Sequence, residues 1–214
     1  MACPVKIDTL LEARWVVPVE PYGTVLPHHA IAIDQGTIQA ILPNAEALSR
    51  FVPNERIILG NHALIPGLVN LHIHAAMSLM RGMADDLPLM EWLSNHIWPA
   101  ETRHVDAGFV FDGTRLACAE MRRGGITCFN DMYFFPEASV QAVLASGMRA
   151  TIGMIVIDFP TPYASDADDY LAKGLALRDE YGRHPLLSFC FAPHAPYTVS
   201  DKVFASVLTY AEQL

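Results

Sequence analysis

From Ile65 onward, the sequence alternates between short apolar runs and longer stretches with helical spacing. The short runs are typical of buried strands, and the longer stretches carry residues that start or stop a helix. Repeated strand–helix units predict an α/β fold with parallel strands and right-handed crossovers. The expected strands are LIPGLVNLHIH, ITCFNDM, MRATIGMIVI and LLSFCFAPHA.

The stretches between and after these strands are predicted to form four helices. Gly124 and Gly125 are expected to stop the helix in DAGFVFDGTRLACAEMRRGG. In PEASVQAVLASG, Pro136 stands near the start and Gly147 just past the end. SDADDYLAKGLALRDEYG begins with several acids, which suit a helix N-terminus, and Ser200 is the expected N-cap in SDKVFASVLTYAEQL.

The first part of the chain has a different pattern. Residues 1–64 are predicted to form a small, mainly β, sandwich-like domain, and residues 65–214 a second domain. Two apolar stretches flank the turn sequence DQG in HHAIAIDQGTIQAILP, which predicts a hairpin. Prolines recur through this part of the chain and discourage long helices.

Polar residues with useful chemistry follow or end three of the four expected strands. His72 and His74 come after the first, Asn130 and Asp131 after the second, and His194 after the fourth. A (β/α)8 barrel gathers its active site at the carboxyl ends of its strands, whereas an open doubly wound sheet usually carries a glycine-rich phosphate loop. The sequence has no G-x-G-x-x-G pattern, so the barrel is the favoured fold.

His72 and His74 lie one residue apart at the end of PGLVNLHIH. Alternate side chains of a strand point to the same face, so both imidazoles are expected on one face, where they could bind one Zn²⁺ ion. Val69, Leu71 and Ile73 form the opposite, apolar face, which suits packing against helices. On the spacing alone, a chance pair in a chain with nine histidines is an equal alternative.

Composition narrows the function classes. The chain is 52% apolar and 17% charged, which favours a large buried core over disorder. Its formal net charge of −9 argues against nucleic acid as a partner. No apolar run approaches the roughly 18 residues of a membrane span, and no signal peptide is recognisable. The four cysteines are scattered, which predicts a reducing, cytoplasmic setting.

Several motifs resemble a known family. IPGLVNLHIHAAMSLMRGMADDLPLMEWL closely resembles the first barrel strand and following loop of the amidohydrolase superfamily. Within it, the loop resembles the cytosine-deaminase-like branch, which includes the 5-methylthioadenosine/S-adenosylhomocysteine deaminases. FAPHAPYTVS is similar to the fourth-strand motif of that branch, and HHAIAIDQGTIQAILP to its N-terminal β domain. The H-x-H pair alone indicates only the superfamily, and its combination with MEWL, WPAE and PHAPYT is more specific.

The resemblance implies roles for individual residues. His72 and His74 match the metal ligands of the first strand, and Trp92 in MEWL matches an aromatic residue that lines the nucleoside pocket. Glu101 in WPAE matches a carboxylate that binds the ribose hydroxyls, and His194 in PHAPYT matches a histidine that contacts the nucleoside. The alternatives are a core tryptophan, a solvated acid at a helix start and a structural loop histidine.

Other charged residues of this part of the chain are expected to be structural. The resemblance gives Asp131 no role, so its place after a strand is interpreted as structural. Arg81, Asp85 and Asp86 are expected to hold the long loop through charge pairs.

The resemblance also implies residues that these 214 residues do not contain. The general acid/base glutamate, further histidines from the fifth and sixth strands, and an aspartate ligand from the eighth are expected beyond Leu214. No catalytic acid/base is therefore assigned within the chain. A complete barrel needs about 250 residues, so the chain is predicted to be the N-terminal half of a (β/α)8 TIM barrel preceded by the small β domain.

The implied activity is hydrolytic deamination with one Zn²⁺ ion per subunit. A zinc-activated water would attack C6 of the adenine ring in 5′-methylthioadenosine, S-adenosylhomocysteine or adenosine, giving an inosine product and ammonia. The expected partners are this small-molecule nucleoside and further copies of the protein in a homo-oligomer, with no nucleic acid and no membrane. The alternatives are a hydrolase of the same branch acting on guanine, another amino-heterocycle or a chlorotriazine, and an inactive truncated chain.

Overall fold

The computed structural model describes residues 3–214, and the chain divides into two compact units, Met1–Pro66 and Gly67–Leu214. Each unit contains one four-stranded sheet. Among the described residues, no helix combines the length and apolar character needed to cross a membrane.

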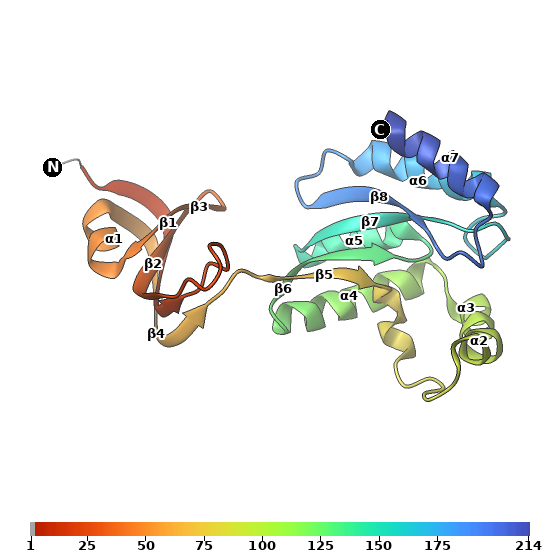
Figure 1. Ribbon diagram of the computed structural model, residues 1–214, viewed down its shortest axis with the longest axis horizontal. Coiled ribbons are helices and arrows are strands. Elements are labelled where there is room, and N and C mark those ends of the chain that lie inside the picture. The colour runs from red at the N-terminus through yellow and green to blue at the C-terminus, as the bar shows by residue number, and fades with distance from the viewer. Residues whose placement is uncertain (1–2) are drawn as a thin grey trace. The chain divides into compact units, whose positions relative to one another are not determined.

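The first unit is a sheet of mixed direction with one short helix (Figure 1). Its strand order is β3-β2-β1-β4, in which β2 is antiparallel to β1 and β3, and β4 is parallel to β1. Its core contains six buried side chains from β1, β2, α1 and β4. The elements are β1 (Val5–Val16), β2 (Leu26–Asp34), β3 (Thr37–Pro43), α1 (Asn44–Arg50) and β4 (Phe51–Leu64).

The hairpin predicted at DQG is confirmed. Asp34 pairs with Thr37, and the two residues between them, Gln35 and Gly36, have φ angles of 48° and 73°. Positive φ at both central positions is the geometry that lets a two-residue turn follow the twist of its strands. The described residues of this unit form a single sheet, so the sandwich-like arrangement stays a prediction.

The second unit contains an all-parallel sheet with the strand order β5-β6-β7-β8. The spatial order follows the chain order, without the reversal of a doubly wound sheet. This confirms the predicted α/β class and the parallel strands. The elements are β5 (Leu68–Ile73), η1 (Ala75–Met80), α2 (Leu89–Trp92), η2 (Leu93–Ile97), α3 (Trp98–His104), α4 (Ala107–Arg123), β6 (Ile126–Met132), α5 (Pro136–Ser146), β7 (Arg149–Val156), α6 (Ala167–Tyr181), β8 (Leu187–Pro193) and α7 (Asp201–Gln213).

The predicted helix ends agree with the structure. The Ser200 side chain caps α7 by accepting from the Val203 N–H, and Gly147 ends α5 with a φ of 62°. Asp106 and Asp166 cap α4 and α6 in the same way as Ser200. These ends were predictable because capping depends on residues close in sequence. The short helices between β5 and α4 were not predicted.

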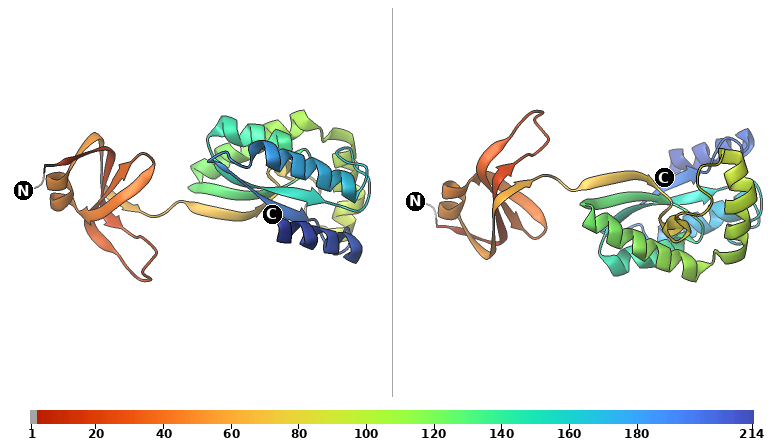
Figure 2. Two further views of the ribbon diagram at one scale, coloured as in Figure 1. Left: turned by 90° about the horizontal axis from the view of Figure 1, so that it is seen from above. Right: turned by 90° about the horizontal axis from the view of Figure 1, so that it is seen from below.

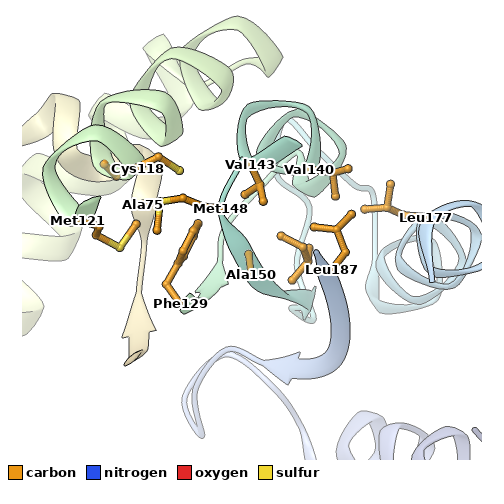
Figure 3. Packing of buried hydrophobic residues seen from close by; sticks show 12 residues of the cluster. Ala75, Cys118, Met121, Phe129, Val140, Val143, Met148, Ala150, Leu177 and Leu187 are labelled. Carbon is orange, nitrogen blue, oxygen red and sulfur yellow. The ribbon is translucent and has the colours of Figure 1, made fainter. Parts of the chain in front are cut away.

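Helices α4, α5 and α6 pack along one face of the parallel sheet (Figure 2). Figure 3 shows the resulting core, in which Met121 of α4 lies near Phe129 of β6, and Val140 and Val143 of α5 lie toward Leu187 of β8. Strands β6, β7 and β8 contribute further side chains to this cluster, and Leu177 of α6 completes it. The packing fixes the strands, and so it fixes the positions of the residues that follow them.

The apolar face predicted for β5 is only partly buried. Ile73 packs against the main core, but Val69 is 57% exposed and Leu71 is 75% exposed. The prediction that all three pack against helices is therefore wrong for Val69 and Leu71. The physical reason is that β5 lies at the edge of its sheet, with β6 as its neighbour, while α5 and α6 pack on β7.

Candidate active site

A cavity of about 490 Å³ lies beside the carboxyl ends of the strands in the second unit. Its walls come from the loops after β5, β6, β7 and β8 and from the short helices α2, η2 and α3. Most of the lining is apolar or aromatic, with few polar groups. His74, Glu101 and His194 are its titratable imidazole and carboxylate groups, and Trp92, Trp98, Tyr133, Phe159 and Tyr197 are among its aromatic residues.

A second, smaller hollow of about 190 Å³ holds the histidine pair. His72 and His74 both line it, together with Asn130, Cys190 and His194. His74 and His194 border both spaces, so the small hollow and the large cavity form one continuous region of residues. The structure thus brings together all five residues singled out in the sequence, with His72 on the small hollow and Trp92 and Glu101 on the large cavity.

The rings of His72 and His74 are 5.2 Å apart between centroids and are arranged edge to face. The Nδ1 atom of His74 lies 2.7 Å from the carbonyl oxygen of Met132. A carbonyl oxygen only accepts hydrogen bonds, so Nδ1 carries a proton, and the neutral form of this tautomer has its lone pair on Nε2. This backbone contact is the kind that orients a metal-binding imidazole.

Glu101 is half-buried in the first turn of α3, and its Oε1 atom accepts a hydrogen bond of 2.8 Å from the hydroxyl of Tyr133. Burial raises the pKa of Glu101, and the Tyr133 hydrogen bond partly opposes that rise. The alternative of a solvated acid at a helix start is therefore wrong, because this carboxylate faces a cavity and has a specific partner.

Trp92 and His194 are far apart in the sequence, and both line the cavity. The indole N–H of Trp92 donates to the Met83 carbonyl oxygen at 3.3 Å, and this half-buried residue lines the cavity. The Nδ1 atom of His194 is 2.9 Å from the Thr198 hydroxyl. Burial, and then the neighbouring His74, lower the pKa of His194, which favours the neutral imidazole.

Asp131 has the structural place that was expected. It is 2% exposed, and its two oxygens accept from the Ala75 N–H at 2.8 Å and the Ser139 hydroxyl at 3.1 Å. These bonds tie the start of η1 and the helix α5 to the end of β6. The carboxylate is not among the groups that line the cavity.

The charge pairs predicted for the long loop after β5 are found only in part. Arg81 forms two hydrogen bonds with Glu120 of α4, at 2.9 and 2.6 Å, so it does fix the loop. Asp85 and Asp86 form no ion pair among the described residues. Long-range partners of this kind depend on which helix packs beside the loop, and the sequence does not show that.

Comparison with known proteins identifies the family. The model of the amidohydrolase family matches residues 63–214, which is most of the chain and all of the candidate site. The chain belongs to the amidohydrolase family. Over 97% of its length it is 52% identical to the 5-methylthioadenosine/S-adenosylhomocysteine deaminase of Saccharophagus degradans, of which it covers 46%. The corresponding protein of Teredinibacter turnerae is 46% identical over a similar range.

Solved structures show the same relationship. An adenosine deaminase from Xanthomonas campestris with bound zinc is 50% identical, with a TM-score of 0.96 over 98% of this chain and 48% of that one. The guanine deaminase of E. coli, at 19% identity and a TM-score of 0.82, shares the fold alone. This amidohydrolase chain spans about half the length of the curated relatives it matches.

The histidine pair fits part of a metal site in this amidohydrolase. The imidazoles face one hollow, and one of them is already oriented by a backbone carbonyl. Among residues 3–214, however, no group of three or more His, Cys, Asp and Glu side chains is placed to hold a metal ion. A protein zinc site takes three or four protein ligands, so His72 and His74 would form one part of the coordination.

Tyr133 is the residue of the site that the sequence analysis missed. It directly follows β6, is 5% exposed, and binds Glu101, which is 32 positions away in the chain. The available signal was that Tyr133 comes just after a strand, as His74 and His194 do. A tyrosine in the apolar segment MYFF resembles a core residue, and only the folded chain shows its partner.

Proposed function

We propose that this chain is the N-terminal half of a zinc-dependent amidohydrolase that deaminates an adenine nucleoside. The substrate class is 5′-methylthioadenosine, S-adenosylhomocysteine or adenosine, and the products are the matching inosine compound and ammonia. The observation that carries the proposal is one cavity next to the histidine pair, bordered by an indole, an imidazole and a carboxylate with one oxygen that accepts no hydrogen bond from residues 3–214. The names of the relatives with 52% and 46% identity support the substrate class.

Each side chain has a task that its chemistry allows. The indole of Trp92 offers an apolar wall for the purine, and Glu101 can accept hydrogen bonds from two vicinal ribose hydroxyls. His194 borders both spaces and is suited to contact the ring between the sugar and the metal. The apolar lining excludes water from the bound base, which strengthens the polar contacts.

His72 and His74 are proposed to hold one Zn²⁺ ion per subunit, with the other ligands and the general acid/base supplied by barrel strands outside these 214 residues. Bound zinc supplies Lewis-acid activation of water near neutral pH. The four parallel strands would be the first half of the (β/α)8 barrel. A cytoplasmic homo-oligomer that binds neither nucleic acid nor membrane completes the proposal.

The test is a substrate panel on the full-length protein, purified with zinc. We expect the protein to deaminate 5′-methylthioadenosine, S-adenosylhomocysteine or adenosine, and the change in ultraviolet absorbance measures this reaction. A chelator that removes the zinc should abolish the activity. Guanine, other amino-heterocycles and chlorotriazines are the matched comparison substrates. Turnover of one of these with no turnover of any adenine nucleoside would overturn the proposal and favour another hydrolase of the branch.

A further inference from the structure

The hydroxyl of Tyr133 is directed at the carboxylate that lines the cavity. Tyr133 is 5% exposed, and its hydroxyl donates to Glu101 Oε1 at 2.8 Å. None of residues 3–214 donates a hydrogen bond to the other oxygen of Glu101, Oε2. Glu101 itself lines the cavity. The bond therefore occupies one oxygen and leaves the other available to a ligand.

The donor and the acceptor of this bond have fixed roles. Burial and the nearby Glu101 carboxylate raise the pKa of Tyr133 far above its ordinary value, so the phenol keeps its proton. An ionised carboxylate only accepts hydrogen bonds. The bond thus limits rotation of the Glu101 side chain before any ligand arrives, and less conformational entropy is lost on binding.

Two consecutive residues at the end of β6 hold two parts of the site. The carbonyl oxygen of Met132 binds His74 Nδ1, and the next residue, Tyr133, binds Glu101. The rings of His74 and Tyr133 are 6.4 Å apart between centroids. The end of β6 consequently fixes the distance between the histidine pair and the carboxylate.

We propose that Tyr133 is a positioning residue, whose hydroxyl orients Glu101 to recognise the vicinal hydroxyls of the substrate sugar. This role rests on the nucleoside deaminase function proposed above and adds a residue to it. The positioning role belongs to the Tyr133 hydroxyl. The Tyr133 ring has a separate, packing role, since it lies 5.2 Å from the Phe134 ring between centroids, within an apolar cluster. A substitution that keeps the ring separates positioning from packing.

The test is the Tyr133→Phe variant of the full-length zinc-loaded protein, assayed with adenosine and with 2′,3′-dideoxyadenosine. Losing a hydrogen bond to a charged group should raise KM for adenosine roughly tenfold, with little change in kcat. KM for the dideoxy compound should change by less than about twofold, because it lacks the hydroxyls that Glu101 would bind. In a Glu101→Ala background, which removes the acceptor of this bond, adding Tyr133→Phe should cause no further change.

Tyr163→Phe is the matched control. Tyr163 lies in the same apolar cluster and is 7% exposed, but it does not line the cavity. Removing the Tyr163 hydroxyl should leave KM for both nucleosides unchanged. Thermal unfolding of each variant checks that it folds. Equal losses of affinity for both nucleosides in Tyr133→Phe, or losses that add to those of Glu101→Ala, would overturn the role of Tyr133 alone. A wild-type protein inactive on every adenine nucleoside would overturn the proposed function as well.

Discussion

Two carboxylates lie near the end of β6, and their surroundings differ. Asp131, Ala75 and Ser139 form a buried group that we call the floor of the site, in which both Asp131 oxygens are bonded, to the Ala75 N–H and the Ser139 hydroxyl. Glu101, in the cavity wall, uses one oxygen, for Tyr133. A buried carboxylate with two internal donors stabilises structure, whereas one with a free acceptor beside a cavity is available to a ligand.

The same contrast separates the floor from the histidine pair, the proposed metal-binding part of the site. The floor joins β6, η1 and α5, and all of its partners lie within these residues. Among residues 3–214, the proposed metal-binding part offers the two imidazoles of His72 and His74, fewer than the three or four protein ligands of a zinc site. The floor should therefore respond to mutation in stability, and the wall in binding and catalysis.

The largest effect is expected when the 214-residue chain is assayed alone with added Zn²⁺. If His72 and His74 are its only zinc ligands and the general acid/base comes from outside these residues, as proposed, the chain should not deaminate 5′-methylthioadenosine. Ultraviolet absorbance measures the reaction, and the full-length protein under the same conditions is the control. Turnover of roughly 1 per second or more by the isolated chain would show that its own residues complete the site.

His74→Ala in the full-length protein should have the next largest effect. Removal of a metal ligand should lower kcat/KM by at least about 100-fold, since even residues that only orient ligands often matter that much. Metal content per subunit and kcat/KM are measured together. His62→Ala, at an exposed position of β4, is the control and should change neither. Full zinc occupancy in the His74 variant would contradict its role as a ligand.

Asp131→Ala should destabilise the full-length protein by about 2–4 kcal/mol, because two buried donors, on Ala75 and Ser139, lose their acceptor. Glu101→Gln is the comparison and should change the free energy of unfolding by less than about 1 kcal/mol. Urea unfolding measures both variants. Similar losses for the two would remove the distinction between the floor and the wall.

Glu101→Gln should weaken the binding of nucleosides much more than the binding of a free base. An amide has one acceptor oxygen instead of two, so the affinity for adenosine should fall roughly tenfold, while that for adenine stays close to the wild-type value. Competitive inhibition constants measure both ligands. If both lose affinity equally, Glu101 does not bind the sugar.

The smallest expected effect is a pH dependence of nucleoside affinity. Burial raises the pKa of Glu101, so its carboxylate becomes protonated at a higher pH than an ordinary glutamate. Protonation removes acceptor capacity, so 1/KM for adenosine should fall as the pH drops through this raised pKa. In Glu101→Gln this dependence should disappear, and its persistence would assign it to another group.

Much of the fold could be predicted because it depends on neighbours in sequence. The turn at Gln35 and Gly36, the cap at Ser200 and the helix end at Gly147 all use local hydrogen bonds or local backbone geometry. The spacing of His72 and His74 likewise placed two imidazoles at the end of one strand. The exposure of Leu71 could not be predicted, because it depends on β5 lying at a sheet edge.

The sequence by itself determined the strand–helix units, the helix ends and the residue types available after each strand. Only the tertiary structure decided which of these residues meet. Met132 and His74 are 58 positions apart, and Tyr133 and Glu101 are 32 apart, yet each pair forms a hydrogen bond. The physical reason is that such contacts form only after neighbouring parallel strands bring the ends of distant segments together, and the hydrogen-bonding capacity of a side chain does not name its partner.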